Sequence, residues 1–434
     1  MTVQYPKQFR NLVAFGTDYV AFNVAMALLN INTVLPAFAS RLGGSMTLVG
    51  LLITILLLGW NLPQLPAGNL AARQRRKKPM LVTVSLIGRP VVLIVGIVIA
   101  LTRATPAWLS LLVIFVGMSF FVVADSFATV AWLDILGRAI PPEKRGQYIS
   151  IWQVVKAVGV FGASQLVRCI LSENGPSFPY NYALLFIGGG LALGVSTAAI
   201  TAIYEPPPSQ GETTNGQIAW HDFGKHIVHI WQGDSRLRHI TLARLLFALS
   251  TMAFPFYVLY ATTELRLPVR TIGTFVLAQT IGTLLASLFL GRVADRRGPR
   301  LVIQIGTALV LTAPLLALAM IATQGDGTSL SGLLSRAYVW VYVCMGLAEN
   351  LLMLGFVNYM LEISPPDQRT IYMGAGNAIA SLGVLGPTFA GWLLGRTTYG
   401  VLFVISLLFG IAALVTALRM QNSRWSAGPV EGTN

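Results

Sequence analysis

Two short motifs occur twice in this chain with almost the same separation. GNLAARQRRKK begins at Gly68 and GRVADRRGPR begins at Gly291, 223 residues later. PPEKRGQY begins at Pro141 and PPDQRTIY begins at Pro365, 224 residues later. Self-similarity along a sequence marks repeated structural units. Because two unrelated signals share nearly one offset, we expect the two halves of the chain to be structural copies of each other.

The composition indicates a membrane protein rather than a soluble one. Of the 434 residues, 55% are hydrophobic and only 11% are charged, with a mean hydropathy of +0.68. A soluble domain carries about 25% charged residues. The two cysteines, Cys169 and Cys344, lie in apolar runs and provide neither a disulfide framework nor a metal-ligand spacing. We expect no metal and no cofactor.

Twelve apolar runs are long enough to cross a bilayer as helices, which takes about 20 residues each. The predicted spans are 12–38, 46–66, 80–101, 107–133, 147–171, 181–203, 239–262, 270–290, 301–322, 337–361, 370–394 and 397–418. We therefore expect an all-α integral membrane protein with two pseudo-symmetric six-helix bundles, residues 1–203 and 239–418. A polar linker, residues 204–238, joins the bundles, and residues 419–434 form a tail.

The second half of the linker has an amphipathic pattern. Four apolar residues, Trp220, Phe223, Ile227 and Ile230, fall on one helical face. This pattern favours a helix that lies along the membrane surface. The alternative is a metal site made from three histidines of the same stretch, His221, His226 and His229.

The distribution of Lys and Arg predicts the orientation in the membrane. With the N-terminus inside, the inside segments carry 20 basic residues and the outside loops carry six. Both termini and the linker should therefore be cytoplasmic, in a bacterial-type plasma (inner) membrane. The net charge of +14 then reflects topology and an attraction to anionic lipid rather than nucleic-acid binding.

The twelve helices, the central linker and the repeated motifs resemble the major facilitator superfamily over essentially the whole chain. The most specific match is the loop between the second and third helices of each half, which runs G-x-L-a-D-r-x-G-r-[KR] in that family. The second copy matches at Gly291, Val293, Ala294, Asp295, Arg296, Gly298 and Arg300. The first copy matches at Gly68, Leu70, Ala71 and Arg73. In that copy Ala72 replaces the aspartate and Arg75 replaces the glycine.

In the resembled family the aspartate of this loop latches the cytoplasmic side against the fifth helix of the opposite half. A carboxylate accepts hydrogen bonds from the free N–H groups at a helix N-terminus, so Asp295 would face the helix that starts near Arg145 and Gly146. Because Ala72 lacks a carboxylate, we expect an asymmetric gate, to which we also assign Arg369. The alternative is that each loop is only a tight turn that fixes the topology.

A second family signal, G-x-x-x-G-P-x-x-x-G on the fifth helix, is associated with export by antiport. Here the fifth helix has Gly159 and Gly162 but no proline. The fuller pattern lies on the eleventh helix, at Gly383, Gly386, Pro387 and Gly391. Its position in the other half weakens the export interpretation, and close packing of helices through small residues is the alternative.

Four charged residues lie about ten residues from the cytoplasmic ends of their spans: Arg89, Asp125, Lys156 and Glu349. At about 1.5 Å per residue, this depth is near the middle of a hydrocarbon core about 30 Å thick. Charges there are costly and mark functional sites. The repeat offset maps Asp125 onto Glu349, and the resemblance implies that both line the central cavity. We propose that one of them carries a coupling proton; the alternative for Asp125 is a permanent ion pair with Arg89 or Lys156.

Other polar residues are candidates for the same cavity. Gln153 maps onto Asn377 through the repeat. The first helix is unusually polar and carries Asp18, Asn23, Asn30 and Asn32. The amides of Asn30 and Asn32 either bind a polar ligand or satisfy neighbouring helices. We place Tyr260 of the seventh helix in the outer interfacial belt of aromatic residues.

These features favour a secondary active transporter that moves a small molecule by alternating access. No G-x-x-x-x-G-K-[ST] motif for direct use of ATP occurs, and no nucleophile–base pair or metal cluster indicates an enzyme. We favour proton-coupled export of an amphipathic or drug-like compound by a monomer. One alternative is proton-coupled or facilitated uptake of a metabolite, either a sugar or an organic anion. An alternative of another class is a transport-inactive relative that acts as a sensor or assembly factor.

Overall fold

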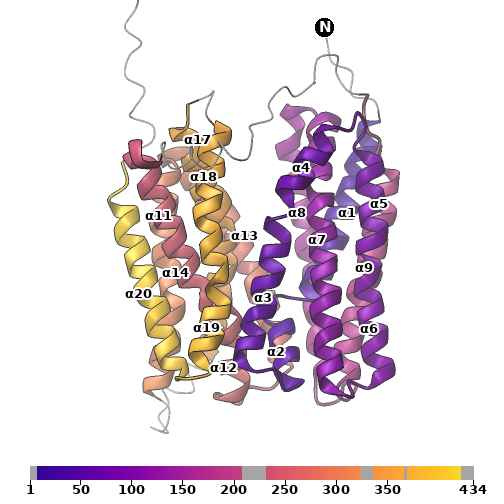
Figure 1. Cartoon of the computed structure of the whole chain (residues 1–434), viewed down its shortest axis with the longest axis vertical. Helices are drawn as coiled ribbons and strands as arrows, with labels where there is room; N and C mark the ends of the chain where they lie inside the picture. Colours follow the sequence, from indigo (N-terminus) through magenta and orange to yellow (C-terminus); the bar gives the residue numbers. More distant parts are fainter. Residues whose placement is uncertain (1–6, 208–230, 324–335, 366–368, 422–434) are drawn as a thin grey trace, which may run out of the picture. The chain divides into compact units, whose positions relative to one another are not determined.

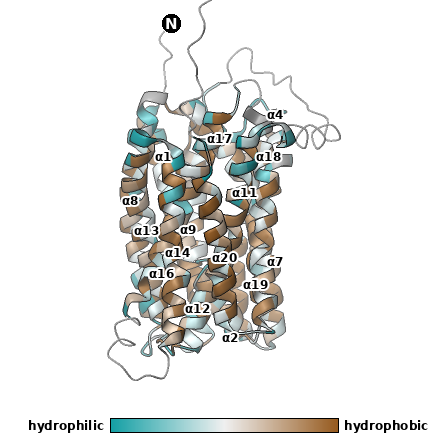
Figure 2. Cartoon of the chain, turned by 90° about the vertical axis from the view of Figure 1, so that its left-hand side faces the viewer, coloured by the Kyte–Doolittle hydropathy of each residue, from teal (hydrophilic) through white to brown (hydrophobic). Residues whose placement is uncertain are grey.

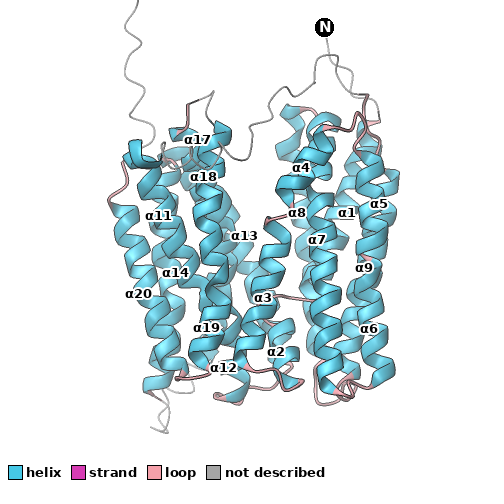
Figure 3. Cartoon of the chain, in the orientation of Figure 1, coloured by secondary structure: helices cyan, strands magenta, loops and turns pink. Residues whose placement is uncertain are grey.

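The computed structural model describes residues 7–207, 231–323, 336–365 and 369–421. These four ranges consist of helices and their connections and contain no β-strand (Figure 3). Twelve helical stretches among them are long and apolar enough to cross a membrane, and hydrophobic residues predominate along them (Figure 2). The expected all-α membrane fold is therefore confirmed. The predicted amphipathic helix and its three histidines lie outside the described residues.

The chain divides into two compact units. Unit 1 comprises residues 1–216 and 261–277, and unit 2 comprises residues 217–260 and 278–434. The helices before the linker are α1 (Gln8–Leu28), α2 (Val34–Arg41), α3 (Met46–Asn61), α4 (Gln64–Ala72), α5 (Lys78–Gly88), α6 (Pro90–Thr102), α7 (Ala107–Ala139), α8 (Pro142–Ile170) and α9 (Tyr180–Ala202) (Figure 1). Helix α1 packs against α8 and α9, α5 packs against α7, and α6 packs against α9.

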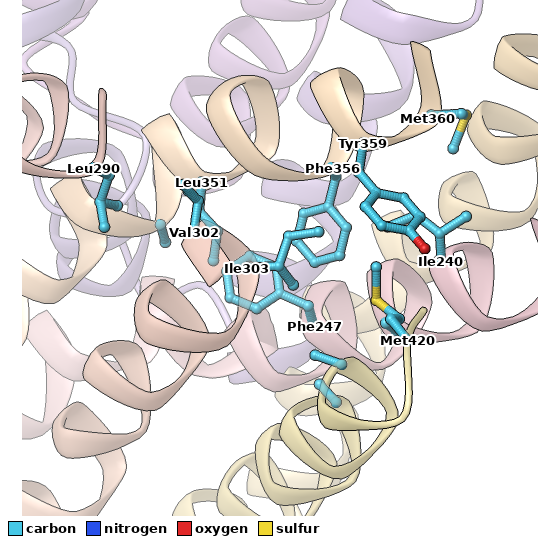
Figure 4. Close-up of a cluster of buried hydrophobic side chains, with 14 of the residues drawn as sticks. Ile240, Phe247, Leu290, Val302, Ile303, Leu351, Phe356, Tyr359, Met360 and Met420 are labelled. Atoms are coloured by element: carbon cyan, nitrogen blue, oxygen red, sulfur yellow. The ribbon is translucent and has the colours of Figure 1, made fainter. Parts of the chain in front are cut away.

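The segments after the linker form spans seven to twelve. They are α11 (Ser235–Ser250), η1 (Thr251–Ala253), α12 (Phe254–Thr263), α13 (Thr271–Arg297), α14 (Pro299–Ala322), α16 (Val339–Leu351), the π-helical η2 (Leu352–Val357), α17 (Asn358–Ile363), α18 (Arg369–Ser381), η3 (Leu382–Leu385), α19 (Gly386–Leu394) and α20 (Tyr399–Leu418). Spans seven, ten and eleven are each assembled from consecutive helical segments. Figure 4 shows the core of unit 2, in which Phe247, Ile303 and Phe356 pack together with other buried apolar side chains.

The first span ends earlier than predicted. Helix α1 stops at Leu28, not at residue 38, and α2 restarts at Val34. The cause is Asn30, whose carbonyl oxygen accepts the N–H of Val34 at 3.0 Å while its side-chain oxygen accepts the N–H of Asn32 at 2.9 Å. An Asn that bonds backbone two residues ahead builds a turn in place of a helix. The break therefore lies at Asn30, and the Asn30 amide takes part in it.

The two copies of the basic loop fold differently. In the second copy α13 continues to Arg297, and Gly298, with φ of 86°, turns the chain directly into α14. A positive φ of this size favours glycine. In the first copy the equivalent residue is Arg75, α4 ends at Ala72, and residues 73–77 form an irregular connection to α5. The first copy, which has Arg75 in place of this glycine, thus has the longer irregular connection.

Candidate functional site

Arg89 occupies the break between α5 and α6, inside the third span. The break follows from Pro90, which has no N–H to donate and fixes its own backbone. The N–H of Arg89 still bonds the carbonyl of Ser85 at 3.1 Å, so α5 is regular up to this break. At this level α5 lies against α7 so closely that a Cβ on Gly88 would come within 2.4 Å of the Ala124 side chain. This close packing places Arg89 beside residue 125 of α7.

Two carboxylates share this guanidinium. Nη2 of Arg89 lies 3.1 Å from Oδ1 of Asp125, and Nη1 lies 3.2 Å from Oδ1 of Asp18. Nη1 also donates to Oγ of Ser196 at 2.6 Å. Between 4% and 6% of each of the three charged side chains is exposed. Arg89 is thus held by side chains from α1, α7 and α9 within unit 1.

Asp18 accepts the larger number of hydrogen bonds. Ser196 Oγ donates to its Oδ1, and Nε1 of Trp132 donates to its Oδ2 at 2.7 Å. From the sequence, Asp18 was predicted only as one of the polar residues of the first helix, six residues into the span 12–38. In the structure α1 begins earlier, at Gln8, so Asp18 lies ten residues from its start. The buried charged cluster of unit 1 therefore has one more carboxylate than was predicted.

The other candidates of unit 1 lie on α8. Lys156 is only 9% exposed, and its Nζ lies 5.6 Å from the centre of the Tyr19 ring on α1. A cation over an aromatic face is attracted by the ring quadrupole. Gln153, one turn before Lys156, is half-buried. The structure therefore brings Asp125 to Arg89, and Lys156 to an aromatic ring of the first span.

Glu349 in unit 2 has a different environment. It lies on α16, its side chain is exposed, and Nε2 of Gln279 on α13 donates to its Oε1. Oγ1 of Thr283, one turn along α13, lies 3.2 Å from its Oε2. Asn350 extends this contact by donating to the carbonyl of Thr283 at 2.7 Å. Gln279 and Thr283 thus offer Glu349 an amide and a hydroxyl, both uncharged.

Two glycines allow this contact between α13 and α16. A Cβ on Gly346 would lie 2.0 Å from the carbonyl oxygen of Gln279, and one on Gly282 would lie 2.1 Å from that of Val343. Small residues let two helix backbones approach closely in membranes. The short amide and hydroxyl side chains of α13 therefore reach the carboxylate directly.

Substitution of Gly346 by alanine should lower the midpoint of thermal unfolding, because the added Cβ meets backbone that must move. Overpacking of this kind costs about 1–3 kcal/mol. The matched control is Gly194→Ala on α9, where a Cβ meets nothing within 4 Å. Thermal melts of the two purified variants decide the point: equal midpoints would show that α13 and α16 are not held this closely.

Two further predicted residues, Asn377 and Tyr260, lie in unit 2. Asn377 on α18 is exposed and accepts from Nη1 of Arg244 on α11 at 2.9 Å. Tyr260 is 1% exposed and packs against Tyr338, Tyr399 and Phe403. Its assignment to the interfacial belt was wrong, because its ring is covered by these aromatic neighbours rather than exposed at the membrane surface.

The gating residues lie mostly at helix ends. Arg145 donates through Nε to the carbonyl of Ile140 at 3.0 Å and through Nη2 to that of Gly137, which satisfies carbonyls at the end of α7. Arg300 donates to the carbonyl of Leu418 at 3.1 Å. Arg73, Asp295 and Arg296 are exposed, and Gly68 and Gly291 lie within α4 and α13. The side chain of Arg369 lies outside the described residues, and the contact expected for Asp295 stays a prediction.

Comparison with known proteins agrees with this architecture. A family model described as Major Facilitator Superfamily matches residues 18–240 and 240–433. No curated protein gives a significant sequence match. Among the described ranges, no three His, Cys, Asp or Glu side chains are grouped to hold a metal ion.

Several solved structures share the fold at low identity. A bacterial homologue of the iron transporter ferroportin, in an inward-facing state, has a TM-score of 0.67 and 15% identity, covering 96% of this chain and 99% of its own. A bacterial homologue of the human lysosomal transporter Spinster has a TM-score of 0.67 and 16% identity, covering 98% and 100%. A D-xylose–proton symporter has a TM-score of 0.66 and 13% identity, covering 97% and 99%.

Proposed function

This chain belongs to the Major Facilitator Superfamily, and on that premise we propose that it is a secondary active transporter that moves a small molecule by alternating access. The match of the family model to both halves supports this proposal. The excess of basic residues on one side of the predicted topology supports an orientation with both termini in the cytoplasm. The solved structures that share the fold are named for different cargoes and therefore do not indicate one substrate class. The polar and aromatic residues of this chain provide the evidence for its substrate.

We propose that Glu349, rather than Asp125, carries the coupling proton. The observation behind this choice is the chemistry of their partners. A hydroxyl and a carboxamide can each donate or accept a hydrogen bond, so Thr283 and Gln279 can bond Glu349 in either protonation state. Arg89 only donates, so it favours an ionised Asp125. Glu349 is also the exposed carboxylate, whereas Asp125 is buried.

The substrate that fits these residues best is a cationic or neutral amphipathic compound, and we propose export as its direction. An organic anion needs an available cation, but Arg89 is engaged by two carboxylates. Half-buried rings on α1 and α3 provide apolar contact area, with the centres of Phe22 and Trp60 5.9 Å apart. Aromatic faces also attract cationic groups. Uptake of a sugar is the second candidate, because the exposed amide of Asn377 can bond a hydroxyl group of a neutral polyol.

A proton-flux assay tests the proposed function. The protein is reconstituted in liposomes that contain a pH-sensitive dye and is challenged with cationic drugs, sugars and organic acids. We expect a pH change with one or more cationic amphipaths and none in protein-free liposomes. A response to sugars alone would favour uptake of a metabolite, and a response to organic acids alone would contradict the substrate class. No response across the panel would favour the transport-inactive alternative.

A further inference from the structure

The first residues of the linker are fastened to unit 1. Asn11 on α1 pairs with the backbone of Tyr204 in both directions: its Nδ2 donates to the carbonyl at 3.0 Å and its Oδ1 accepts the N–H at 2.8 Å. Nζ of Lys78 on α5 donates to the carbonyl of Thr201 at 2.8 Å. The chain therefore leaves the sixth span along the ends of the first and third spans.

Glu205 is the centre of this attachment. Its side chain is 4% exposed, Oε1 accepts the backbone N–H of Lys77 at 2.7 Å, and Oε2 accepts that of Lys78 at 3.1 Å. These N–H groups begin α5, where no carbonyl of the helix can bond them. A carboxylate at this position is also favoured by the helix dipole. Since Pro79 has no N–H, Glu205 takes most of the free donors at the start of this helix.

The same carboxylate belongs to a balanced ionic network. Oε1 of Glu205 lies 3.0 Å from Nη2 of Arg138, at the end of α7. Asp134 pairs with both Arg138 and Lys77. Two carboxylates and two cations thus join the start of α5, the end of α7 and the root of the linker. The start of α5 is also the end of the first copy of the basic loop, in which Ala72 replaces the expected aspartate. The carboxylate that bonds this end of the loop belongs to Glu205 of the linker.

The other root of the linker carries a comparable carboxylate. Asp234 caps α11 by accepting the N–H of Arg236 at 2.8 Å. Its second oxygen accepts the hydroxyl of Tyr372, on α18, at 2.8 Å. Tyr372 is the last residue of the repeated PPDQRTIY motif and is 6% exposed. In each unit, a carboxylate at the linker root therefore binds the N-terminus of one helix and a side chain of a second helix.

We propose that Glu205 and Asp234 are positioning residues, which hold helix ends together so that each unit moves as one block during the transport cycle. The inference rests on the proposed function, since it concerns the movement that alternating access requires. The alternative is that the attached linker acts as a covalent tether that limits how far the units can separate, and its length argues against this role. The 28 residues between the two attachments would reach about 95 Å when extended, so the covalent connection alone sets no useful limit. The carboxylates must act locally, each within its own unit.

Single-molecule fluorescence transfer in proteoliposomes tests this assignment. Dyes are attached at Arg75→Cys and Arg297→Cys, both exposed positions, in a Cys169→Ser, Cys344→Ala background. We expect the full-length protein to exchange between two transfer states. Glu205→Gln and Tyr372→Phe should each slow this exchange several-fold, because one end of a unit no longer moves with the rest.

Two matched variants separate positioning from general stability. Glu173→Gln removes an exposed carboxylate of unit 1 that lies between α8 and α9 and is not part of this network. Tyr359→Phe removes a tyrosine hydroxyl of the same unit as Tyr372 that donates to the carbonyl of Gln421. Both should exchange at the wild-type rate. Cleavage at a protease site inserted between Gly211 and Glu212 should also leave the rate unchanged, because the two attachments act locally.

Each outcome decides a separate point. Wild-type exchange in Glu205→Gln or in Tyr372→Phe would overturn the assignment for that unit. Equal slowing in the matched variants would contradict the assignment and indicate a general loss of stability. Slowing after cleavage of the linker would contradict it in another way, because it would show that the covalent connection between the units sets the rate. A full-length protein with a single transfer state would instead contradict the proposed function. Should Glu205→Gln fail to fold, Tyr372→Phe, which removes one oxygen, carries the same test.

Discussion

Substitution of Glu349 by glutamine is expected to reduce proton-driven flux to the level of protein-free liposomes. The carboxamide cannot take up and release a proton, but its oxygen can accept a hydrogen bond from Gln279 and its NH2 group can donate one to the hydroxyl of Thr283. The variant should therefore remain folded, with a thermal midpoint close to that of the wild type. Flux driven by a pH gradient and exchange of substrate at equal pH are measured on the same proteoliposomes. We expect the first to be lost and the second to persist.

Asp125→Asn is the matched control for this prediction. It removes the carboxylate at the equivalent place of the repeat, but leaves Asp18 on the same guanidinium. Proton-driven flux should persist in Asp125→Asn, although the protein should be less stable. The opposite pattern, with flux lost in Asp125→Asn and retained in Glu349→Gln, would assign the coupling proton to the buried cluster of unit 1.

Substitution of Arg89 by methionine is expected to have the largest effect on folding. Asp18 and Asp125 would keep their positions with no guanidinium between them, and both are 4–5% exposed. Removal of one partner from a buried ion pair costs about 3–5 kcal/mol, since an uncompensated charge remains. This is a large share of the ~5–15 kcal/mol that stabilises a typical native protein. We expect little monodisperse protein after extraction, measured by size-exclusion chromatography and thermal melts.

A charge-neutral variant provides the control for Arg89. Combining Arg89→Met with Asp18→Asn and Asp125→Asn removes all three charges, and replacement of a whole buried ionic group is often tolerated. The triple variant should regain a substantial part of the lost stability. If the single and triple variants are equally unstable, the role of Arg89 lies in its shape and packing between α5 and α6 and not in its charge.

Part of the buried cluster could be predicted from the sequence by depth alone. Counting residues from the helix ends placed Arg89 and Asp125 at a similar level. The same count did not include Asp18, because Asp18 is only six residues into the predicted span 12–38 but ten residues into the observed helix. Depth does not say which charges meet, however. Lys156 and Arg89 were equal candidates for Asp125, and the structure shows an ion pair between Arg89 and Asp125.

The linker carboxylates show a different limit. Glu205 and Asp234 lie in a polar segment, where a charged residue carries no special signal in the sequence. Their importance comes from what they bind, and the backbone donors at the start of α5 lie more than 120 residues before Glu205. The departure at Ala72 was visible as a missing carboxylate, but the residue that bonds the end of that loop could not be identified from either motif.

The sequence by itself determined the class of the protein, its twelve spans and its two related halves. Hydropathy and repeated motifs depend on residues that are close in the sequence, so both can be recognised without knowledge of the fold. Only the tertiary structure decided that Asp18, Asp125 and Ser196 converge on Arg89, and that Gln279 reaches Glu349. These partners are separated by 36 to 107 residues. Their meeting depends on glycines that let helices approach, and such packing is fixed only when all the helices are in place.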